Sequence, residues 1–137
     1  MDHSVLVRVL GFPAVLLHGD LLVLDRWRWL KRRLPKTRSG EALIDIGCGT
    51  GAFTIGAARF GYKNVGLSWD ARNQKVSGER AKICSVDVAF PIGDVRALGQ
   101  IGEFKSCIEI AICCENIEHV LDDRKLMKDI TSCGGPV

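Results

Sequence analysis

The feature that most constrains the fold is a short apolar segment that runs straight into a glycine-rich turn. Residues 42–46 are apolar apart from Asp45, and residues 47–51 read Gly-Cys-Gly-Thr-Gly. A helical segment follows through Phe60 and ends at Gly61. A strand that ends in glycines and leads into a helix brings backbone N–H groups close to a ligand. The pattern therefore predicts an α/β fold with a ligand site at the end of this strand.

The chain beyond this turn continues the alternation of short apolar runs and longer helical stretches. We predict further strands over residues 64–69, 86–90 and 107–113, and helices over residues 71–84 and from Asp122 or Asp123 onward. Such alternation is typical of a parallel sheet covered by crossover helices. Glu109 interrupts the last apolar run, although a strand buried on both faces should be uniformly apolar. We therefore expect this strand to lie near an edge of the sheet.

The first 38 residues differ from the rest in charge. They hold eight Lys and Arg against three Asp and Glu, whereas residues 39–137 hold eleven against thirteen. Apolar side chains recur at helical spacing within residues 21–34, namely Val23, Trp27, Leu30 and Leu34. We predict that residues 1–38 form a basic amphipathic helical segment, with Asp20 as N-cap and Pro35 as stop, packed on a domain of residues 39–137. The cations would equally suit an anionic substrate, a membrane surface or nucleic acid, so their partner stays open.

Length and composition limit the remaining classes. A chain of 137 residues has room for one domain, and its apolar run from Val9 to Leu17 is too short to cross a bilayer. The acidic start does not resemble a signal peptide. The six cysteines are too few for a disulfide scaffold and contain no C-x-x-C pair. We expect a cytoplasmic location, and no metal site from Cys113, Cys114 and His119, because adjacent strand residues point to opposite faces.

Asp45 separates two interpretations of the glycine turn. Gly47, Gly49 and Ala52 also satisfy the G-x-G-x-x-A dinucleotide pattern, so the glycines alone do not choose. A carboxylate two residues before the first glycine would repel a pyrophosphate and attract a cationic group. Asp70 ends the next strand, at the edge where open α/β sheets bind ligands, and an acid there can accept both hydroxyls of a ribose. These residues favour a ligand with a ribose and an ammonium group but no phosphates.

The landmarks resemble those of the class I S-adenosylmethionine-dependent methyltransferases over roughly residues 41–135. They follow the family's order. Residues 45–51 resemble motif I, Asp70 resembles the acid after strand two, and Gly93-Asp94-Val95 resembles the adenine-side motif. Residues 113–120 resemble the strand-four exit of the small-molecule branch, and Gly134-Gly135 resembles the turn before strand five. The resemblance implies a Rossmann-like doubly wound parallel sheet with its first four strands in the order 3-2-1-4. It also implies that strands five to seven are missing and the chain is truncated.

The resemblance further implies S-adenosyl-L-methionine as cofactor and a small molecule as methyl acceptor. The methionine moiety would be held by Asp45 and the turn residues Gly47, Cys48, Gly49 and Gly51. The ribose would be held by Asp70, and the adenine by Asp94 and Val95. Glu115 completes the expected cofactor-binding set. A nucleic-acid acceptor is not favoured, because Cys114-Glu115-Asn116 differs from the N-P-P-Y type of motif.

Each site residue also has a structural explanation. Asp45 fits a satisfied turn acid, Asp70 a helix N-cap and Asp94 ordinary turn material. His119 is the expected catalytic base because its ordinary pKa lies near neutral, yet it also fits a core histidine. Glu115 also fits the solvated start of a helix.

Three functions remain open at this stage. We expect a small-molecule methyltransferase. The alternatives are a non-catalytic or degenerate fragment of one, and a Rossmann-type NAD(P)-dependent oxidoreductase. The sequence does not identify the acceptor, the atom methylated or the oligomeric state, and whether a truncated chain is active also stays open.

Overall fold

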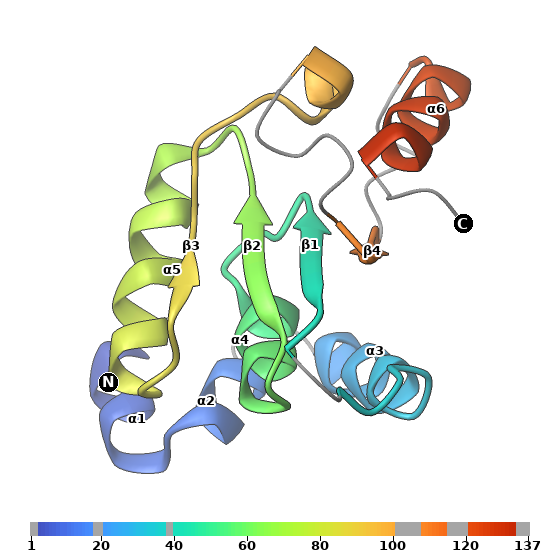
Figure 1. Ribbon diagram of the computed structural model, residues 1–137. Helices are drawn as coiled ribbons and strands as arrows, with labels where there is room; N and C mark the ends of the chain where they lie inside the picture. The colour runs from blue at the N-terminus through green and yellow to red at the C-terminus, as the bar shows by residue number, and fades with distance from the viewer. Residues whose placement is uncertain (1–2, 18–20, 38–39, 101–107, 115–120, 134–137) are drawn as a thin grey trace.

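The computed structural model describes residues 3–17, 21–37, 40–100, 108–114 and 121–133 (Figure 1). Its strands are β1 (Ala42–Ile46), β2 (Lys63–Leu67), β3 (Val88–Ala89) and β4 (Ile110–Ile112). They form one four-stranded sheet in the order β3-β2-β1-β4, and every neighbouring pair is parallel. The predicted strand order and the Rossmann-like fold class are therefore confirmed.

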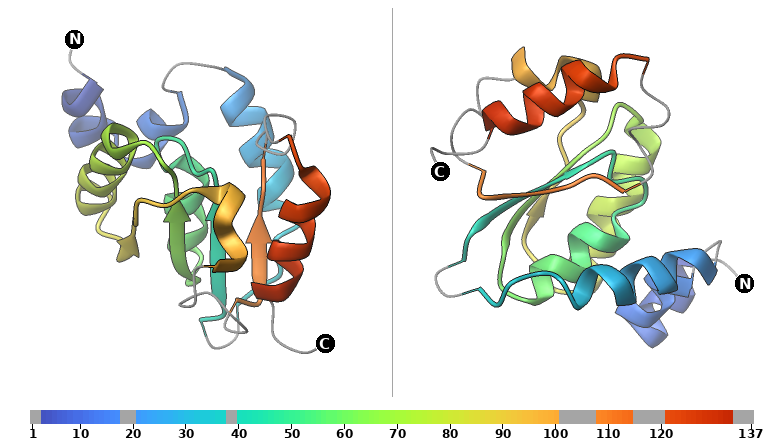
Figure 2. Two further views of the ribbon diagram at one scale, coloured as in Figure 1. Left: turned by 90° about the horizontal axis from the view of Figure 1, so that it is seen from above. Right: turned by 90° about the vertical axis from the view of Figure 1, so that its right-hand side faces the viewer.

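Helices cover both faces of this sheet (Figure 2). They are α1 (His3–Leu10), α2 (Phe12–Leu17), α3 (Leu21–Lys31), α4 (Ala52–Arg59), α5 (Ala71–Ile83) and α6 (Asp123–Cys133), with a 3-10 helix η1 (Val95–Gln100). Because side chains alternate along a strand, Leu43 packs with α1–α5 on one face, whereas Ile44 and Ile46 pack with η1 and α6 on the other. Within the described part of the chain, no helix is long and apolar enough to cross a membrane.

Three strands are shorter than the sequence predicts. The second covers Lys63–Leu67 rather than residues 64–69, because Ser68 makes only an isolated bridge to Ile92. The third covers Val88–Ala89 rather than residues 86–90, because the Val86 N–H bonds the carbonyl of Ala81 in α5 instead of a strand. The fourth covers Ile110–Ile112 rather than residues 107–113, because the Ile108 N–H bonds the carbonyl of Cys133 in α6. Within the described sheet β4 pairs only with β1, and Glu109 beside it is exposed. The prediction that the fourth strand lies near an edge of the sheet is therefore confirmed.

Helices α1 and α2 lie within residues 1–38, which the sequence predicts to be a helical segment, but their separate bounds are not predicted. Pro13 reads as a break in the apolar run, but it is the second residue of α2, where a helix does not need the backbone N–H that proline lacks. Gly11, with φ of +66°, joins the two helices. Residues 3–17 therefore fold as two short helices joined at Gly11.

Helix α3 packs its apolar stripe on α4, as the spacing predicts. Trp27 and Leu30 are buried, and the Trp27 ring stacks with Phe53 and Phe60 at centroid distances of 6.4 and 5.7 Å. The helix ends at Lys31 rather than at residue 34, because the Arg33 N–H bonds the Leu30 carbonyl three residues back and so tightens the last turn. The expected N-cap Asp20 lies outside the described residues, and the domain division at residues 38 and 39 stays a prediction.

Candidate functional site

The loops that leave β1, β2 and β3 meet at the carboxyl edge of the sheet. The N–H groups of Gly47 and Cys48 donate to the Leu67 carbonyl at 2.9 and 3.0 Å, which ties the glycine turn to the end of β2. The Gly93 N–H donates to the Ser68 carbonyl at 2.9 Å, which ties the exit of β3 to the same place. The structure therefore brings together the segments on which the sequence places Asp45, Asp70 and Asp94.

The glycine turn needs glycine for its backbone conformation. Gly47, Gly49 and Gly51 have φ of +73°, +55° and +83°, a region that side chains disfavour. A Cβ on Gly51 would lie 2.9 Å from the Ser77 hydroxyl, whereas a Cβ on Gly49 would meet no atom within 4 Å. The turn therefore packs tightly against α5 at Gly51 and borders open space at Gly49.

Asp45 is a buried carboxylate whose charge is poorly compensated. It is 1% exposed, and its Oδ2 accepts a hydrogen bond from the Thr54 hydroxyl at 2.7 Å. Burial raises the pKa of Asp45 from 3.8 to about 6, although hydrogen bonds from Thr54 act in the opposite direction. The hydrogen bond matches the turn-acid explanation, but the raised pKa means that Thr54 alone does not offset the loss of water. A cationic group beside Asp45 would stabilise its ionised form.

Asp70 caps α5 with one of its two oxygens. Its Oδ1 accepts the N–H groups of Arg72 and Asn73 at 2.9 and 3.2 Å, which confirms the N-cap interpretation. Among the described residues, no group donates to Oδ2, and the side chain is half-buried. The capping role therefore leaves one carboxylate oxygen for a hydroxyl donor.

Gln74 links all three loops, and sequence reasoning missed it. Its side-chain amide donates to the carbonyls of Gly66 in β2 and Pro91 after β3. Its Oε1 accepts the Cys48 thiol at 3.2 Å. Burial, with the nearby Asp45 charge, raises the pKa of Cys48 well above its usual range, so the thiol is neutral. The available signal was a polar residue in the first turn of the helix after Asp70.

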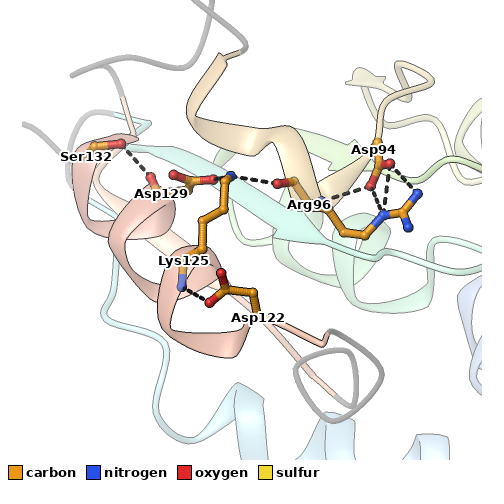
Figure 3. Close-up of polar contacts among 6 residues, drawn as sticks. All are labelled: Asp94, Arg96, Asp122, Lys125, Asp129 and Ser132. Atoms are coloured by element: carbon orange, nitrogen blue, oxygen red, sulfur yellow. Dashed lines mark hydrogen bonds and ion pairs between the residues drawn. The ribbon is translucent and has the colours of Figure 1, made fainter.

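Asp94 forms an ion pair with Arg96, and Val95 is buried in the core. Figure 3 shows that both Asp94 oxygens face the Arg96 guanidinium, with the shortest N–O distance 2.6 Å. Side-chain hydrogen bonds from Arg96 lower the pKa of Asp94. Val95 is buried in the core beside Ile44 and Leu98. The Asp-x-Arg spacing was the sequence signal for this ion pair.

Helix α6 holds η1, the segment that begins with Val95. The Lys125 ammonium donates to the Arg96 carbonyl and to the Asp129 carboxylate, each at 2.7 Å (Figure 3). These contacts join the exit of β3 to the helix after β4. The remaining predicted residues, Glu115 and His119, lie outside the described residues.

The described residues fit a ligand with an ammonium group and a ribose. Asp45 is a buried acid with a raised pKa, Asp70 keeps one oxygen without a described partner, and Gly49 borders open space. Asp94 is paired with Arg96, and its expected adenine contact stays a prediction. The arrangement combines a cation-attracting acid with a glycine turn in which the N–H groups of Gly47, Cys48 and Gly51 already donate to backbone carbonyls.

Comparison with known proteins gives one family. The profile of the methyltransferase domain family matches residues 22–136. A ribosomal protein L11 methyltransferase of Thiobacillus denitrificans is 36% identical over 74 residues, which are 53% of this chain and 24% of that protein. A ubiquinone biosynthesis O-methyltransferase of Rhizobium etli is 30% identical over 91 residues, which are 66% of this chain and 36% of that protein.

The fold matches solved structures as well. A geranyl diphosphate C-methyltransferase of Streptomyces coelicolor, solved with S-adenosyl-L-homocysteine, superposes with a TM-score of 0.69 at 20% identity. The match covers 82% of this chain and 42% of that chain. The chain therefore spans about a quarter to two fifths of the length of these relatives.

Proposed function

The chain belongs to the methyltransferase domain family, and from this premise we propose that it binds S-adenosylmethionine and transfers the methyl group to a small-molecule acceptor. The carboxyl edge of the sheet is the proposed binding site, as in other open α/β sheets. The observation that carries the proposal is Asp45, a buried acid beside the glycine turn. Burial raises the pKa of Asp45 to about 6. A bound ammonium group would stabilise its charge.

The cofactor roles follow from the chemistry of each side chain. Asp45 and the turn through Gly47, Cys48, Gly49 and Gly51 would hold the amino acid end of the cofactor, because the acid attracts an ammonium group and the glycines let the backbone approach a ligand closely. The Gly49 position leaves room for this contact. Burial keeps the Cys48 thiol neutral, so it adds no competing charge.

Asp70 and Asp94 would hold the nucleoside. The Asp70 Oδ2, which has no donor among the described residues, would accept a ribose hydroxyl while Oδ1 continues to cap α5. Asp94 would release part of its Arg96 contact to accept an adenine amino group, and buried Val95 would fix the loop beside it. Glu115 remains a proposed cofactor contact, although it lies outside the described residues.

The chemistry asks little of the protein beyond orientation. When bound, S-adenosylmethionine supplies a methyl group that its sulfonium already makes electrophilic. The chain must align an acceptor behind that methyl group, and such alignment supplies ~7 to 11 kcal/mol in favourable cases. His119 is the proposed base for a hydroxyl acceptor, since its ordinary pKa lies near neutral. A His119→Ala variant with normal turnover across the pH range would exclude that role.

The acceptor class rests on the strand-four exit. One of the two relatives reported above is named for a ribosomal protein and the other for ubiquinone biosynthesis, so the names of relatives point to both protein and small-molecule acceptors. Residues 113–120 resemble the small-molecule branch, which favours the second class. Turnover is tested by S-adenosylhomocysteine release when the chain is incubated with S-adenosylmethionine and either the small-molecule or the protein fraction of a cell extract. Release with the protein fraction alone would contradict the proposed acceptor class.

Binding is tested separately from turnover, because the chain spans only part of its relatives' length. We expect S-adenosylhomocysteine to raise the melting temperature and NAD to leave it unchanged. Binding without turnover would support the non-catalytic alternative. Stabilisation by NAD alone would support the oxidoreductase alternative and contradict the proposal.

A further inference from the structure

Helices α1–α3 expose an unusual share of apolar side chains. Among the described residues, seven of the twelve exposed large hydrophobic side chains lie on these three short helices, namely Val5, Val9, Leu10, Leu17, Leu21, Leu22 and Trp29. Two of them, Val9 and Leu21, are 75% and 74% exposed. Exposed apolar side chains that gather on one part of a protein mark an interaction surface. The same helices already bury Trp27 and Leu30 against α4, so these exposed side chains are additional to the core contacts.

The same segment also carries cations. The described residues between 3 and 37 carry seven Lys and Arg and one acid, Asp25, and most of the cations are exposed. The exposed ones are Arg8, Arg28, Lys31, Arg32, Arg33 and Lys36. Asp25 lies 3.7 Å from Arg28, and the Arg33 guanidinium stacks 4.0 Å from the centre of the exposed Trp29 ring. We call these cations and the seven apolar side chains together the α1–α3 surface.

A hollow of about 370 Å³ opens between α2, α3 and α4 beside this surface. Its apolar walls include Phe12, Leu16 and Trp27. Arg28, Lys31 and Arg59 also line it, and all three are exposed. An apolar hollow bordered by cations matches the two parts of an anionic lipid, a charged headgroup and a hydrocarbon chain.

The mixture of side chains decides between the partners that attract a basic surface. Nucleic acid rewards cations that contact phosphates and aromatic rings that stack on bases, but it gives little for exposed Val and Leu side chains. A bilayer with anionic lipids rewards both kinds of group, because cations reach the headgroups while apolar side chains and Trp enter the interface. We propose that the α1–α3 surface binds the surface of an anionic phospholipid bilayer.

The fold sets the orientation of the bound chain. Figures 1 and 2 show α1–α3 at the end of the molecule where the strands begin, whereas the loops of the candidate site leave the opposite ends of the strands. A chain bound through α1–α3 therefore keeps the carboxyl edge of the sheet away from the lipid. Membrane binding is independent of methyl transfer, and its test needs no cofactor.

The test is flotation of the whole chain with vesicles of phosphatidylcholine alone or of an equimolar mixture with phosphatidylglycerol. We expect binding to the mixed vesicles only, and weaker binding at high salt, because salt screens the cations. One variant removes cations, Arg28→Gln with Lys31→Gln and Arg32→Gln. The other removes apolar groups, Leu21→Gln with Leu22→Gln and Trp29→Gln. Each should lower the partition coefficient by about tenfold or more.

Control variants remove three cations or two apolar side chains at exposed positions elsewhere. Lys75→Gln with Lys82→Gln and Lys128→Gln removes three cations, and Leu121→Gln with Met127→Gln removes apolar side chains. Both controls should float like the unchanged chain, and all variants should keep its melting temperature. Equal losses in the controls and the test variants would overturn the proposal. It would also be overturned if the apolar variant kept full vesicle binding, or if duplex DNA bound the chain and the apolar variant alike while vesicles did not.

Discussion

At the scale of single residues, Asp45 links stability to function. Its pKa is raised by burial from 3.8 to about 6, which corresponds to about 3 kcal/mol of destabilisation once the group is ionised in the folded chain. Below pH 3.8 both states hold the proton and no stability is lost. As the pH rises through the window from 3.8 to about 6, the unfolded chain releases its proton first, so the free energy of unfolding falls.

This pH dependence gives the first prediction. Asp45→Asn keeps an oxygen that can accept the Thr54 hydrogen bond but carries no charge. At neutral pH the variant should therefore exceed the unchanged chain in free energy of unfolding by up to about 3 kcal/mol, and the excess should vanish near pH 4. Urea unfolding of both chains at several pH values measures the difference, in which contributions from other groups cancel. A variant that is less stable at every pH would show that the Asp45 charge supports the fold.

Gly49 and Gly51, the last two glycines of the turn, give a second, matched prediction. Gly51→Ala should lower the free energy of unfolding by about 3 kcal/mol, because φ is +83° and the new Cβ would lie 2.9 Å from the Ser77 hydroxyl. Gly49→Ala should cost only about 1 kcal/mol, because open space surrounds the new Cβ. It should nevertheless weaken S-adenosylhomocysteine binding by about tenfold, because that space is the proposed place of the cofactor.

A third glycine serves as the control for this pair. Gly78 lies inside α5 with no atom within 4 Å of a new Cβ, so Gly78→Ala should stabilise the chain by up to about 1 kcal/mol and leave binding unchanged. Denaturant unfolding and calorimetric titration measure both quantities for all three variants. If Gly49→Ala bound S-adenosylhomocysteine as tightly as Gly78→Ala, the turn would not border the cofactor.

At the scale of elements, the packing of α3 on α4 depends on one close contact. A Cβ on Gly56 would lie 2.4 Å from the Trp27 ring, so Gly56→Ala should cost about 2 kcal/mol by overpacking. Trp27→Leu alone should cost about 3 kcal/mol, because it leaves a cavity beside Phe53 and Phe60. The double variant should cost clearly less than the two separate losses together, since the leucine makes room for the new methyl group. Additive losses, measured by unfolding, would mean that α3 does not rest on Gly56.

The elements also show what local pattern predicts and what it misses. The predicted β1 matches Ala42–Ile46, and α5 begins at residue 71 as predicted, because apolar runs and a capping Asp are local signals. The predicted length of β3 is wrong, because the Val86 N–H bonds a carbonyl of α5 instead of a neighbouring strand. Which of these two acceptors the N–H bonds is decided only in the folded chain. The bounds of α2 are missed because Pro13 reads as a break although the first turn of a helix tolerates it.

The candidate site was predictable in outline for a similar reason. The topology of a parallel sheet brings the ends of β1, β2 and β3 to one edge, so Asp45, Asp70 and Asp94 could be grouped from the sequence. Their hydrogen-bond partners were predictable only in part. The Asp-x-Arg spacing indicates Arg96, whereas Thr54 and Gln74 lie far from their partners Asp45 and Cys48 in the sequence and meet them only in the folded chain.

At the scale of the whole molecule, the two ends of the sheet have different proposed tasks. The carboxyl edge carries the acids and the glycine turn, whereas the starting ends of the strands lie beside the basic and apolar helices α1–α3 (Figure 1). The two tasks are separable, because the side chains proposed for one are absent from the other. Changes on the α1–α3 surface should therefore leave S-adenosylhomocysteine affinity unchanged, and calorimetric titration of the vesicle-binding variants checks this expectation. A parallel loss of affinity would show that the two ends are coupled.

The most direct measurement is a calorimetric titration of S-adenosylhomocysteine into the unchanged chain and into Asp45→Asn. At about pH 7.5 Asp45 is ionised, and we expect the variant to bind at least about tenfold more weakly despite its greater stability. The affinity of the unchanged chain should fall as the pH drops below about 6, where Asp45 gains its proton, while the variant should lack this dependence. Equal affinity of the two chains across this pH range would contradict the claim that Asp45 holds the cofactor.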